Sequence, residues 1–303
     1  MNGFLSMYGF CLLLIGLLCW RVLGVGVRAR GLRRGTRGLL FALCLALGVV
    51  FSRAFYVLTS PFGRLGALVS WMPYEYAMSG AVLGAILGGL LCALLTRQSA
   101  GYVLDAMTPA AMTAAALARC AEMFTDFGWG AVVEGEWARL PFAVPDMFEQ
   151  WRLSVFFLSA ALILLALVVA KVWRKRLPGE LFSIALCWLA MGQIFCETMR
   201  SESICWGFVR VQQLACAVMA LGLLVGWQIK NRLPLAHLRT GLLVFAASIG
   251  VIVFAQYAMD KLTHILPTAA SYGLMAAALI VMGAAVQKTT CAGKQDLLHA
   301  SEK

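Results

Sequence analysis

The feature that most constrains this chain is its succession of long apolar segments. Runs of about eighteen or more apolar residues are long enough to cross the hydrocarbon core of a bilayer as helices. The composition agrees, because 62% of the 303 residues are hydrophobic and only 13% are charged, which excludes an ordinary soluble globule. We therefore predict an all-α, polytopic membrane helix bundle. Nine spans are expected, near residues 3–24, 39–59, 79–96, 105–128, 152–173, 179–199, 205–228, 239–259 and 266–286.

Basic residues gather in the short connections between alternate apolar runs. The net charge is +11, but the basic residues occupy short loops and not one soluble face, so the pattern indicates membrane topology and no nucleic-acid partner. The first run has no basic residue before it and several after it. We therefore expect it to stay as a membrane helix, with the N-terminus outside and the C-terminus in the cytoplasm. The basic connections are at 28–37, 97, 171–176, 230–239 and 288–303.

The longest polar stretch covers roughly residues 130–151, which is too short to form a core of its own. It follows the fourth run and therefore falls on the outer side in the predicted topology. Pro141 and Pro145 interrupt it, and proline is poorly tolerated inside a continuous helix. We expect either a small external cap over the bundle or a simple connecting loop.

Two pairs of opposite charge lie near the ends of long apolar runs. Arg119 and Glu122 are in the fourth run, and Glu197 and Arg200 are at the end of the sixth. An ionisable side chain inside a bilayer costs several kcal/mol, so it is retained mainly where it faces the bundle interior and has a function. The i, i+3 spacing of each pair places its members on one face of a helix, where they can neutralise each other.

Arg53 in the second run and Arg210 in the seventh add two further charges. Counting about 1.5 Å of helix rise per residue puts these charges at the same level as the two pairs, towards the outer side of the bilayer. We therefore predict one polar chamber there. The alternatives are simple intrahelical salt bridges and arginines that snorkel to the outer interface. The excess of arginine favours an anionic lipid as visitor, because the planar guanidinium suits phosphate oxygens.

Other polar and small residues have a structural interpretation. Gly80, Gly84 and Gly88 are spaced as in a helix that a neighbour approaches closely, and we favour packing over a ligand role. Asp105 begins the fourth run, where it is predicted to sit at the helix N-terminus on the cytoplasmic side. The ten cysteines are scattered without a Cys-x-x-Cys pair, so neither a disulfide framework, a metal site nor a cofactor is predicted.

Several short motifs resemble, in order and spacing, those of one family of bacterial membrane enzymes. In the second run, Ser52-Arg-Ala-Phe-Tyr-Val-Leu is similar to the family's Ala-Arg-Leu-x-Tyr-Val-Leu, matching Arg53 and Tyr56. The stretch from Ser79 to Arg119 resembles, without a gap, the segment between the family's His-Gly-Gly motif and its Gly-Arg signature. This family is prolipoprotein diacylglyceryl transferase.

The resemblance continues to the seventh run. Glu197-Thr-Met-Arg200 is similar to the family's Glu-Phe-x-Arg, and Gln213 matches the glutamine of its Gly-Gln-x-x-Ser after a shorter connection. The resemblance covers roughly residues 1–228, as a seven-helix core with the small external segment at 130–151. Residues 229–287 are then predicted to be an additional transmembrane hairpin, and residues 288–303 a polar cytoplasmic tail.

The chain departs from the family pattern at three places. Ser79-Gly80-Ala stands where the family has His-Gly-Gly, and Glu122 stands where the family has asparagine. The family's Asn-Gly-Glu-x-x-Gly-Arg is replaced by Thr125-Asp-Phe-Gly-Trp-Gly130, which keeps the final glycine and loses the acid and the arginine. The resemblance is therefore to a divergent member.

The resemblance implies transfer of a diacylglyceryl group from phosphatidylglycerol, or another anionic lipid, to the lipobox cysteine of prolipoproteins in the bacterial cytoplasmic membrane. The catalytic candidates are Arg119, to hold the lipid phosphate, and Glu197 and Glu122, of which one would orient the arginines or accept the thiol proton. The alternatives are a non-enzymatic lipid- or anion-binding membrane protein of the same fold, and a transferase with another donor or acceptor. The substrate-binding candidates are Arg53, Tyr56, Ser79, Gly80, Gly130, Arg200, Arg210 and Gln213.

Overall fold

The computed structural model describes most of the chain. The described residues are 2–33, 35–60, 76–125, 128–135, 143–146, 149–173, 177–201, 203–206, 209–261 and 267–292. Pro141, the basic positions 174–176 and most of the predicted tail lie outside these ranges.

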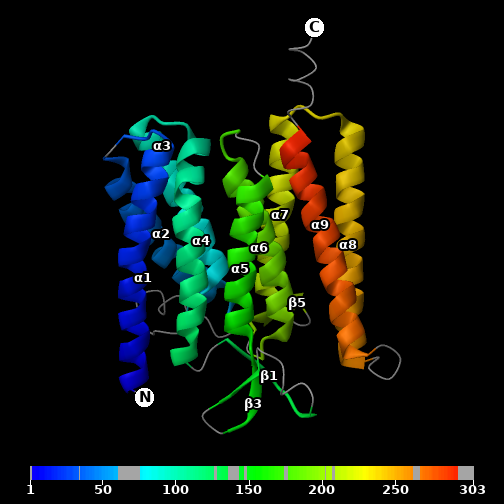
Figure 1. Cartoon of the computed structure of the whole chain (residues 1–303). Helices are drawn as coiled ribbons and strands as arrows, with labels where there is room; N and C mark the ends of the chain where they lie inside the picture. Colours follow the sequence, from blue (N-terminus) through cyan, green and yellow to red (C-terminus); the bar gives the residue numbers. More distant parts are fainter. Residues whose placement is uncertain are drawn as a thin grey trace.

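Long helices dominate and stand side by side across the molecule (Figure 1). Among the described residues, eight helices are long and apolar enough to cross a membrane, so the predicted polytopic helical membrane protein is confirmed. The helix α4 is not among these eight, yet it packs between α1 and α5 within the bundle. The helices are α1 (Asn2–Ala29), α2 (Thr36–Thr59), α3 (Met78–Thr96), α4 (Ala100–Ala121), α5 (Val155–Trp173), α6 (Glu180–Met199), α7 (Val211–Lys230), α8 (Leu235–Lys261) and α9 (Thr268–Ala292).

The predicted bounds of the fourth and seventh helices are wrong. The helix α4 begins five residues before Asp105 and ends at Ala121, where Glu122–Phe124 form a short 3-10 turn, η2. The helix α7 begins at Val211 because the preceding residues pair as a two-stranded hairpin. The predicted start of α4 is too late because the prediction makes Asp105 its N-terminus. The end of α4 and the start of α7 are wrong because the hydropathy of a run does not show where the backbone leaves the helix.

The described basic connections all lie at one end of the bundle. The helices alternate in direction, so α1–α2, α3–α4, α5–α6 and α7–α8 are joined at the upper end in Figure 1, where α9 also ends. The N-terminus lies at the opposite end, together with the strands. We call these the basic end and the sheet end.

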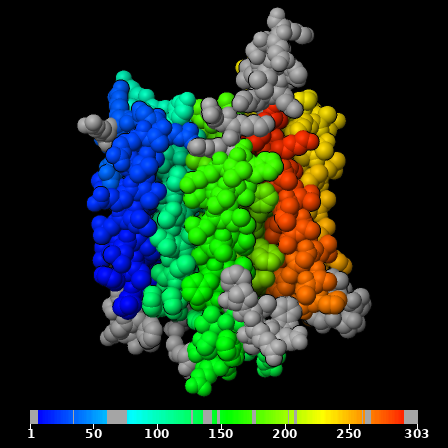
Figure 2. Space-filling model, in the orientation of Figure 1, coloured from blue at the N-terminus to red at the C-terminus, as the bar shows by residue number. Residues whose placement is uncertain are grey.

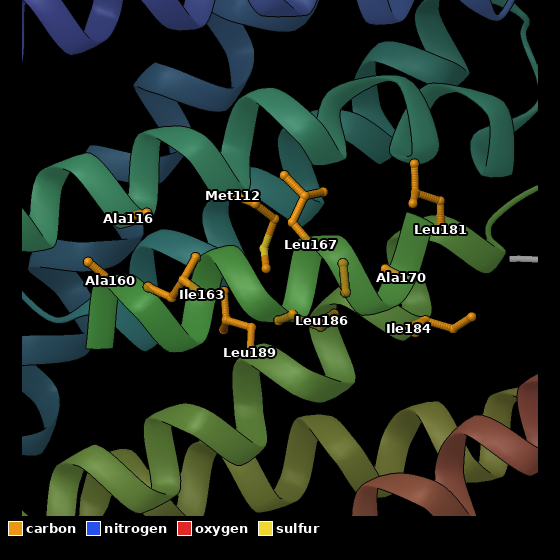
Figure 3. Close-up of a cluster of buried hydrophobic side chains, with 12 residues drawn as sticks. Met112, Ala116, Ala160, Ile163, Leu167, Ala170, Leu181, Ile184, Leu186 and Leu189 are labelled. Atoms are coloured by element: carbon orange, nitrogen blue, oxygen red, sulfur yellow. The ribbon is translucent and has the colours of Figure 1, made fainter. Parts of the chain in front are cut away.

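A described apolar cluster joins α4, α5 and α6 in the middle of the bundle (Figure 3). Its members are buried, so these three helices are held in fixed positions relative to one another. Beside them, the backbones of α2 and α3 are in close contact at the glycines of α3. A methyl group at Gly84 would come within 2.2 Å of the Leu47 carbonyl oxygen. The close packing predicted for the glycines of α3 is therefore confirmed.

Two small sheets cover the sheet end. In the first, β1 (Trp129–Val132), β3 (Trp151–Ser154) and β2 (Ala143–Pro145) pair antiparallel in the order β1-β3-β2. This sheet leads directly into α5 and projects beyond the helices (Figure 2). The second is a hairpin of β4 (Cys205–Trp206) and β5 (Val209–Arg210) between α6 and α7. The described part of the segment predicted to be external thus includes strands at this end, and we call the sheet of β1, β3 and β2 the cap.

The last two helices form a hairpin that packs on α6 and α7. Polar contacts support this packing. The Trp188 indole nitrogen donates to Gln287 Oε1 of α9 at 2.7 Å, and the Asn231 amide donates to the Thr289 carbonyl oxygen at 2.9 Å. Hydrogen bonds of this kind hold helices together in an apolar medium.

Candidate functional site

Glu122 lies between two arginines from different parts of the chain. Its Oε1 pairs with Arg119 Nη1, and its Oε2 accepts from Arg200 Nη2 at 3.1 Å. The Arg119 and Arg200 side chains are only 6% and 10% exposed, whereas Glu122 is 18% exposed. The predicted Arg119–Glu122 pair is therefore present, and it belongs to a three-residue cluster that joins the end of α4 to the end of α6.

Local backbone geometry places Glu122 in this cluster. Because α4 ends at Ala121, Glu122 is in η2 and not in a helix interior. The chain then turns at Gly128, whose φ is +83°, and a methyl group there would come within 2.5 Å of Glu122 Oε2. Glycine is the residue that adopts this left-handed conformation without strain and leaves room for the carboxylate.

Gly130 holds the other side of the cluster in place. It forms an isolated antiparallel bridge with Arg200, and the adjacent Ser201 amide donates to the Trp129 carbonyl oxygen at 3.1 Å. A methyl group at Gly130 would come within 2.9 Å of the Met199 carbonyl oxygen. The cap strand β1 therefore fixes the backbone of Arg200, and only glycine allows so close an approach.

Glu197 lies behind the cluster and contacts it less directly. It is 1% exposed, and its Oε2 lies 3.9 Å from Arg200 Nε. Arg200 follows the last residue of α6 in an extended conformation, so the pair does not lie on a helix face as its spacing predicted. Gln193, which the sequence reasoning missed, connects Glu197 to Arg119, with its amide nitrogen 3.4 Å from Glu197 Oε2 and its Oε1 3.5 Å from Arg119 Nη2.

The two adjacent glutamines of α7 have different hydrogen-bond partners, and Ser79 bonds to the first of them. Ser79 Oγ donates to Gln212 Oε1 at 2.9 Å, and both residues are buried. Gln213, the predicted member of the site, instead donates to the Ile194 carbonyl oxygen at 3.0 Å and accepts from Gln256 of α8 at 2.9 Å. Gln212 was missed because spacing along the chain does not show which of two adjacent helical residues faces a given neighbour.

A comparison with protein-family models shows to which family a chain with this cluster belongs. The model described as prolipoprotein diacylglyceryl transferase matches residues 3–229, which include every residue of the cluster. The chain belongs to this family. The match ends where α7 ends, so α8 and α9 lie beyond it.

Relatives of the transferase family are similar over a shorter stretch. Phosphatidylglycerol–prolipoprotein diacylglyceryl transferases of Streptococcus pyogenes serotype M5 (strain Manfredo), serotype M49 (strain NZ131) and serotype M1 are each 28% identical over 127 residues. The matched region is 40% of this chain and 49% of each relative. The chain thus spans about half the length of the curated relatives that it matches. No solved structure is significantly similar to it.

The remaining residues at positions that match the family's motifs lie around the sheet end. Arg53 is 5% exposed near the end of α2, and its guanidinium carbon lies 5.6 Å from the centre of the Tyr76 ring. Tyr56 follows it by one turn and is half-buried. Gly80 of α3 approaches the α2 backbone, since a methyl group there would come within 2.4 Å of the Phe51 carbonyl oxygen.

Arg210 contacts the backbone that follows α6. Its Nη1 donates to the Glu197 carbonyl oxygen, to the Arg200 carbonyl oxygen at 3.1 Å and to Ser203 Oγ at 2.7 Å. A cation at this position stabilises the free carbonyl groups of a helix C-terminus. Arg210 lies just before α7 and not inside it, so its predicted place within the seventh helix is wrong, but its contact with the Arg200 carbonyl puts it at the level of the cluster.

Asp105 lies at the basic end, away from this cluster. It was predicted at the N-terminus of its own helix, but it lies within α4 and contacts the N-terminus of α6 instead. Its oxygens accept from the amides of Gly179 at 3.1 Å and Phe182 at 2.9 Å, and Oδ2 pairs with Arg30 at 3.2 Å. This carboxylate therefore fixes α6, on which Glu197 and Arg200 are carried.

The chemistry available at the cluster is anion binding. Two buried guanidinium groups of this transferase-family member converge on the two oxygens of one carboxylate, and arginine binds phosphate oxygens in the same geometry. No group of three or more His, Cys, Asp or Glu side chains is arranged as metal ligands within the described part of the chain.

Proposed function

We propose that this chain transfers a diacylglyceryl group from phosphatidylglycerol to the lipobox cysteine of prolipoproteins. The observation that carries the proposal is the Arg119–Glu122–Arg200 cluster, which is buried at one end of a helix bundle that belongs to the transferase family. Family membership supports the reaction. The arginines of the cluster suit the phosphate of the donor lipid, and its glutamate suits the removal of a proton from the acceptor thiol.

Arg119 and Arg200 are the proposed phosphate ligands. In the reaction, the lipobox sulfur attacks the glycerol carbon that carries the phosphate ester. A carbon–sulfur bond forms, the carbon–oxygen bond breaks, and glycerol phosphate leaves with the electron pair of that bond. The two guanidinium groups, with Arg53 as a further candidate, would stabilise the charge that develops on the leaving phosphate. The other substrate-binding candidates stay predictions; they are Tyr56, Ser79, Gly80, Gly130, Arg210 and Gln213.

Glu122 is the better candidate for the group that accepts the thiol proton. The thiolate and not the thiol is the nucleophile, so a base is needed. Glu122 is 18% exposed, whereas Glu197 is 1% exposed behind Arg200. A phosphate bound to Arg119 and Arg200 would take the place of the Glu122 carboxylate between them and release it to accept the proton. Glu197 would then orient Arg200.

The proposed setting is the bacterial cytoplasmic membrane, with the sheet end on the outer side. The basic connections at the opposite end are expected in the cytoplasm by the positive-inside rule. A prolipoprotein would then present its lipobox cysteine at the outer side, beside the cap formed by β1, β2 and β3. The donor lipid would enter the site from the outer leaflet.

The test is to express the chain in cells that are depleted of their own transferase and to measure the mass of a lipobox reporter peptide. A diacylglyceryl mass increase is expected with the wild-type chain, and the Arg119→Ala variant should abolish it. An inserted wild-type chain that leaves the peptide mass unchanged would overturn the proposal. That outcome would favour the non-enzymatic lipid-binding alternative, which the replacements of the family's histidine and asparagine also support.

A further inference from the structure

A second polar feature lies on α1 and α2, away from the Glu122 cluster. A cavity of about 470 Å³ is lined by Leu17, Leu18, Trp20, Arg21 and Arg37. Four of these residues belong to α1, and Arg37 is in the first turn of α2, at the basic end. The helix α1 forms one edge of the molecule, and its outer face is open in the space-filling view (Figure 2).

Arg37 is held firmly in this cavity. Its Nε and Nη2 donate to the Trp20 carbonyl oxygen at 3.1 and 2.7 Å, and its guanidinium carbon lies 3.9 Å from the centre of the Trp20 ring. Gly24 makes room for this group, because a methyl group there would come within 2.9 Å of the guanidinium carbon. A guanidinium has five N–H donors, and only two are used in these bonds. Arg37 is therefore oriented and still able to bind an anion.

Arg21 brings a second positive charge to the same cavity. It lies on the exposed side of α1, eight residues before the end of the helix at Ala29, which corresponds to roughly 12 Å of helix rise. A charge at this depth is costly on a surface that faces lipid. None of the five lining residues is acidic, so no residue that lines the cavity neutralises the two guanidinium groups.

The remaining walls suit an acyl chain. Leu17 is 65% exposed and Leu18 is 44% exposed, and both lie on the N-terminal side of Arg21, towards the middle of the bundle. The cavity thus has a positively charged part near the basic end and an apolar part deeper in the membrane. A phospholipid has the same order of groups, because its phosphate lies at the surface and its acyl chains extend inwards.

We propose that this cavity binds an anionic phospholipid from the leaflet at the basic end. Its phosphate lies between Arg21 and Arg37, and one acyl chain runs along Leu17 and Leu18. The site is distinct from the Glu122 cluster, which is at the sheet end, and therefore takes lipid from the other leaflet. It needs no transfer chemistry, so it stands whether or not the proposed function holds.

The test localises lipid contact by photocrosslinking. Benzoylphenylalanine is placed at position 18 of the full chain, in nanodiscs of dioleoyl phosphatidylglycerol and dioleoyl phosphatidylcholine in equal amounts. The lipid adducts are identified by mass spectrometry. Each cation near an anionic headgroup is expected to enrich phosphatidylglycerol about fivefold over the bulk ratio, so the two arginines together should enrich it about fivefold or more. The same probe at Leu13, which is 70% exposed but outside the cavity, should report the bulk ratio.

Charge variants provide the matched controls. Arg21→Gln should return the adduct ratio at position 18 towards the bulk value, and Arg37→Gln should do the same. Lys171→Gln removes one positive charge near the basic end from the exposed surface of α5, and should leave the enrichment unchanged. A bulk adduct ratio at position 18 in the wild-type chain would overturn the proposal. So would an enrichment in the Arg21→Gln chain as large as that of the wild-type chain.

Discussion

The Glu122→Gln substitution tests whether this carboxylate neutralises the buried arginines. Glutamine keeps the shape of the side chain and one carbonyl oxygen, but it removes the negative charge. Arg119 and Arg200 would then keep their positive charges at 6% and 10% exposure. Among the described residues, Glu197 is the acid left to balance them, 3.9 Å from Arg200 Nε. The substitution therefore leaves one buried positive charge without a partner.

The expected cost follows from this geometry. Removing one partner of a buried ion pair destabilises a protein by about 3–5 kcal/mol. Glu122 is itself 18% exposed, so water can compensate part of the loss and the lower value, about 3 kcal/mol, is expected. For a chain of 303 residues, with an unfolding entropy of about 0.6 kcal/mol/K, that corresponds to a decrease in Tm on the order of 5 °C.

The assay is thermal unfolding of the purified protein in detergent micelles, detected by a dye that reacts with cysteines as they become exposed. The matched control is Asp146→Asn, which removes the acid of an ion pair in the cap, where Arg152 lies at 2.9 Å and is 31% exposed. The Asp146 carboxylate is 9% exposed, but the Arg152 charge that stays behind is 31% exposed and can be hydrated. The loss is therefore expected to be about 1 kcal/mol or less, and this Tm should fall less than that of Glu122→Gln. If Glu122→Gln lowers Tm no more than Asp146→Asn, the reasoning about the cluster is refuted.

Three further predictions concern backbone fit, helix fixation and the added hairpin. Gly128→Ala should lower both Tm and transfer activity more than Gly135→Ala, because both glycines have positive φ but only a methyl group at Gly128 meets Glu122; equal effects on the two readouts would contradict this. Asp105→Ala should lower Tm by a value corresponding to about 3 kcal/mol, since it leaves two amides of the α6 N-terminus and Arg30 without their acceptor; an unchanged Tm would refute the predicted fixation of α6. Gln256→Leu should cost about 0.6 kcal/mol by loss of its bond to Gln213, and a destabilisation of several kcal/mol would contradict this value, because the bond would then hold α8 far more strongly than predicted.

Much of the fold could be predicted from the sequence because long apolar runs leave few alternatives. A run of this length must hydrogen-bond its own backbone in a membrane, and a helix achieves that locally. Helix ends were harder to predict. At Glu122–Phe124 and before Val211, apolar and charged residues are interspersed while the backbone leaves the helix, so composition does not mark the boundary.

The candidate site was only partly predictable for a related reason. Spacing along the chain indicated that Arg119 could pair with Glu122, and the structure contains this pair. Spacing could not indicate that Arg200, 78 positions later, shares the same carboxylate, because that contact depends on how α4 and α6 pack. Asp105 is a further example, since the helix N-terminus that it contacts belongs to α6 and not to α4.

The central claim is tested most directly by reconstitution. The purified chain is placed in phosphatidylglycerol liposomes with a synthetic lipobox peptide, and the diacylglyceryl peptide and glycerol phosphate are both quantified by mass spectrometry. We predict that the two products form in equal amounts, that a peptide with serine in place of the cysteine forms neither, and that Arg119→Ala lowers the rate by about 100-fold or more. A folded, inserted wild-type chain that forms neither product would contradict the account.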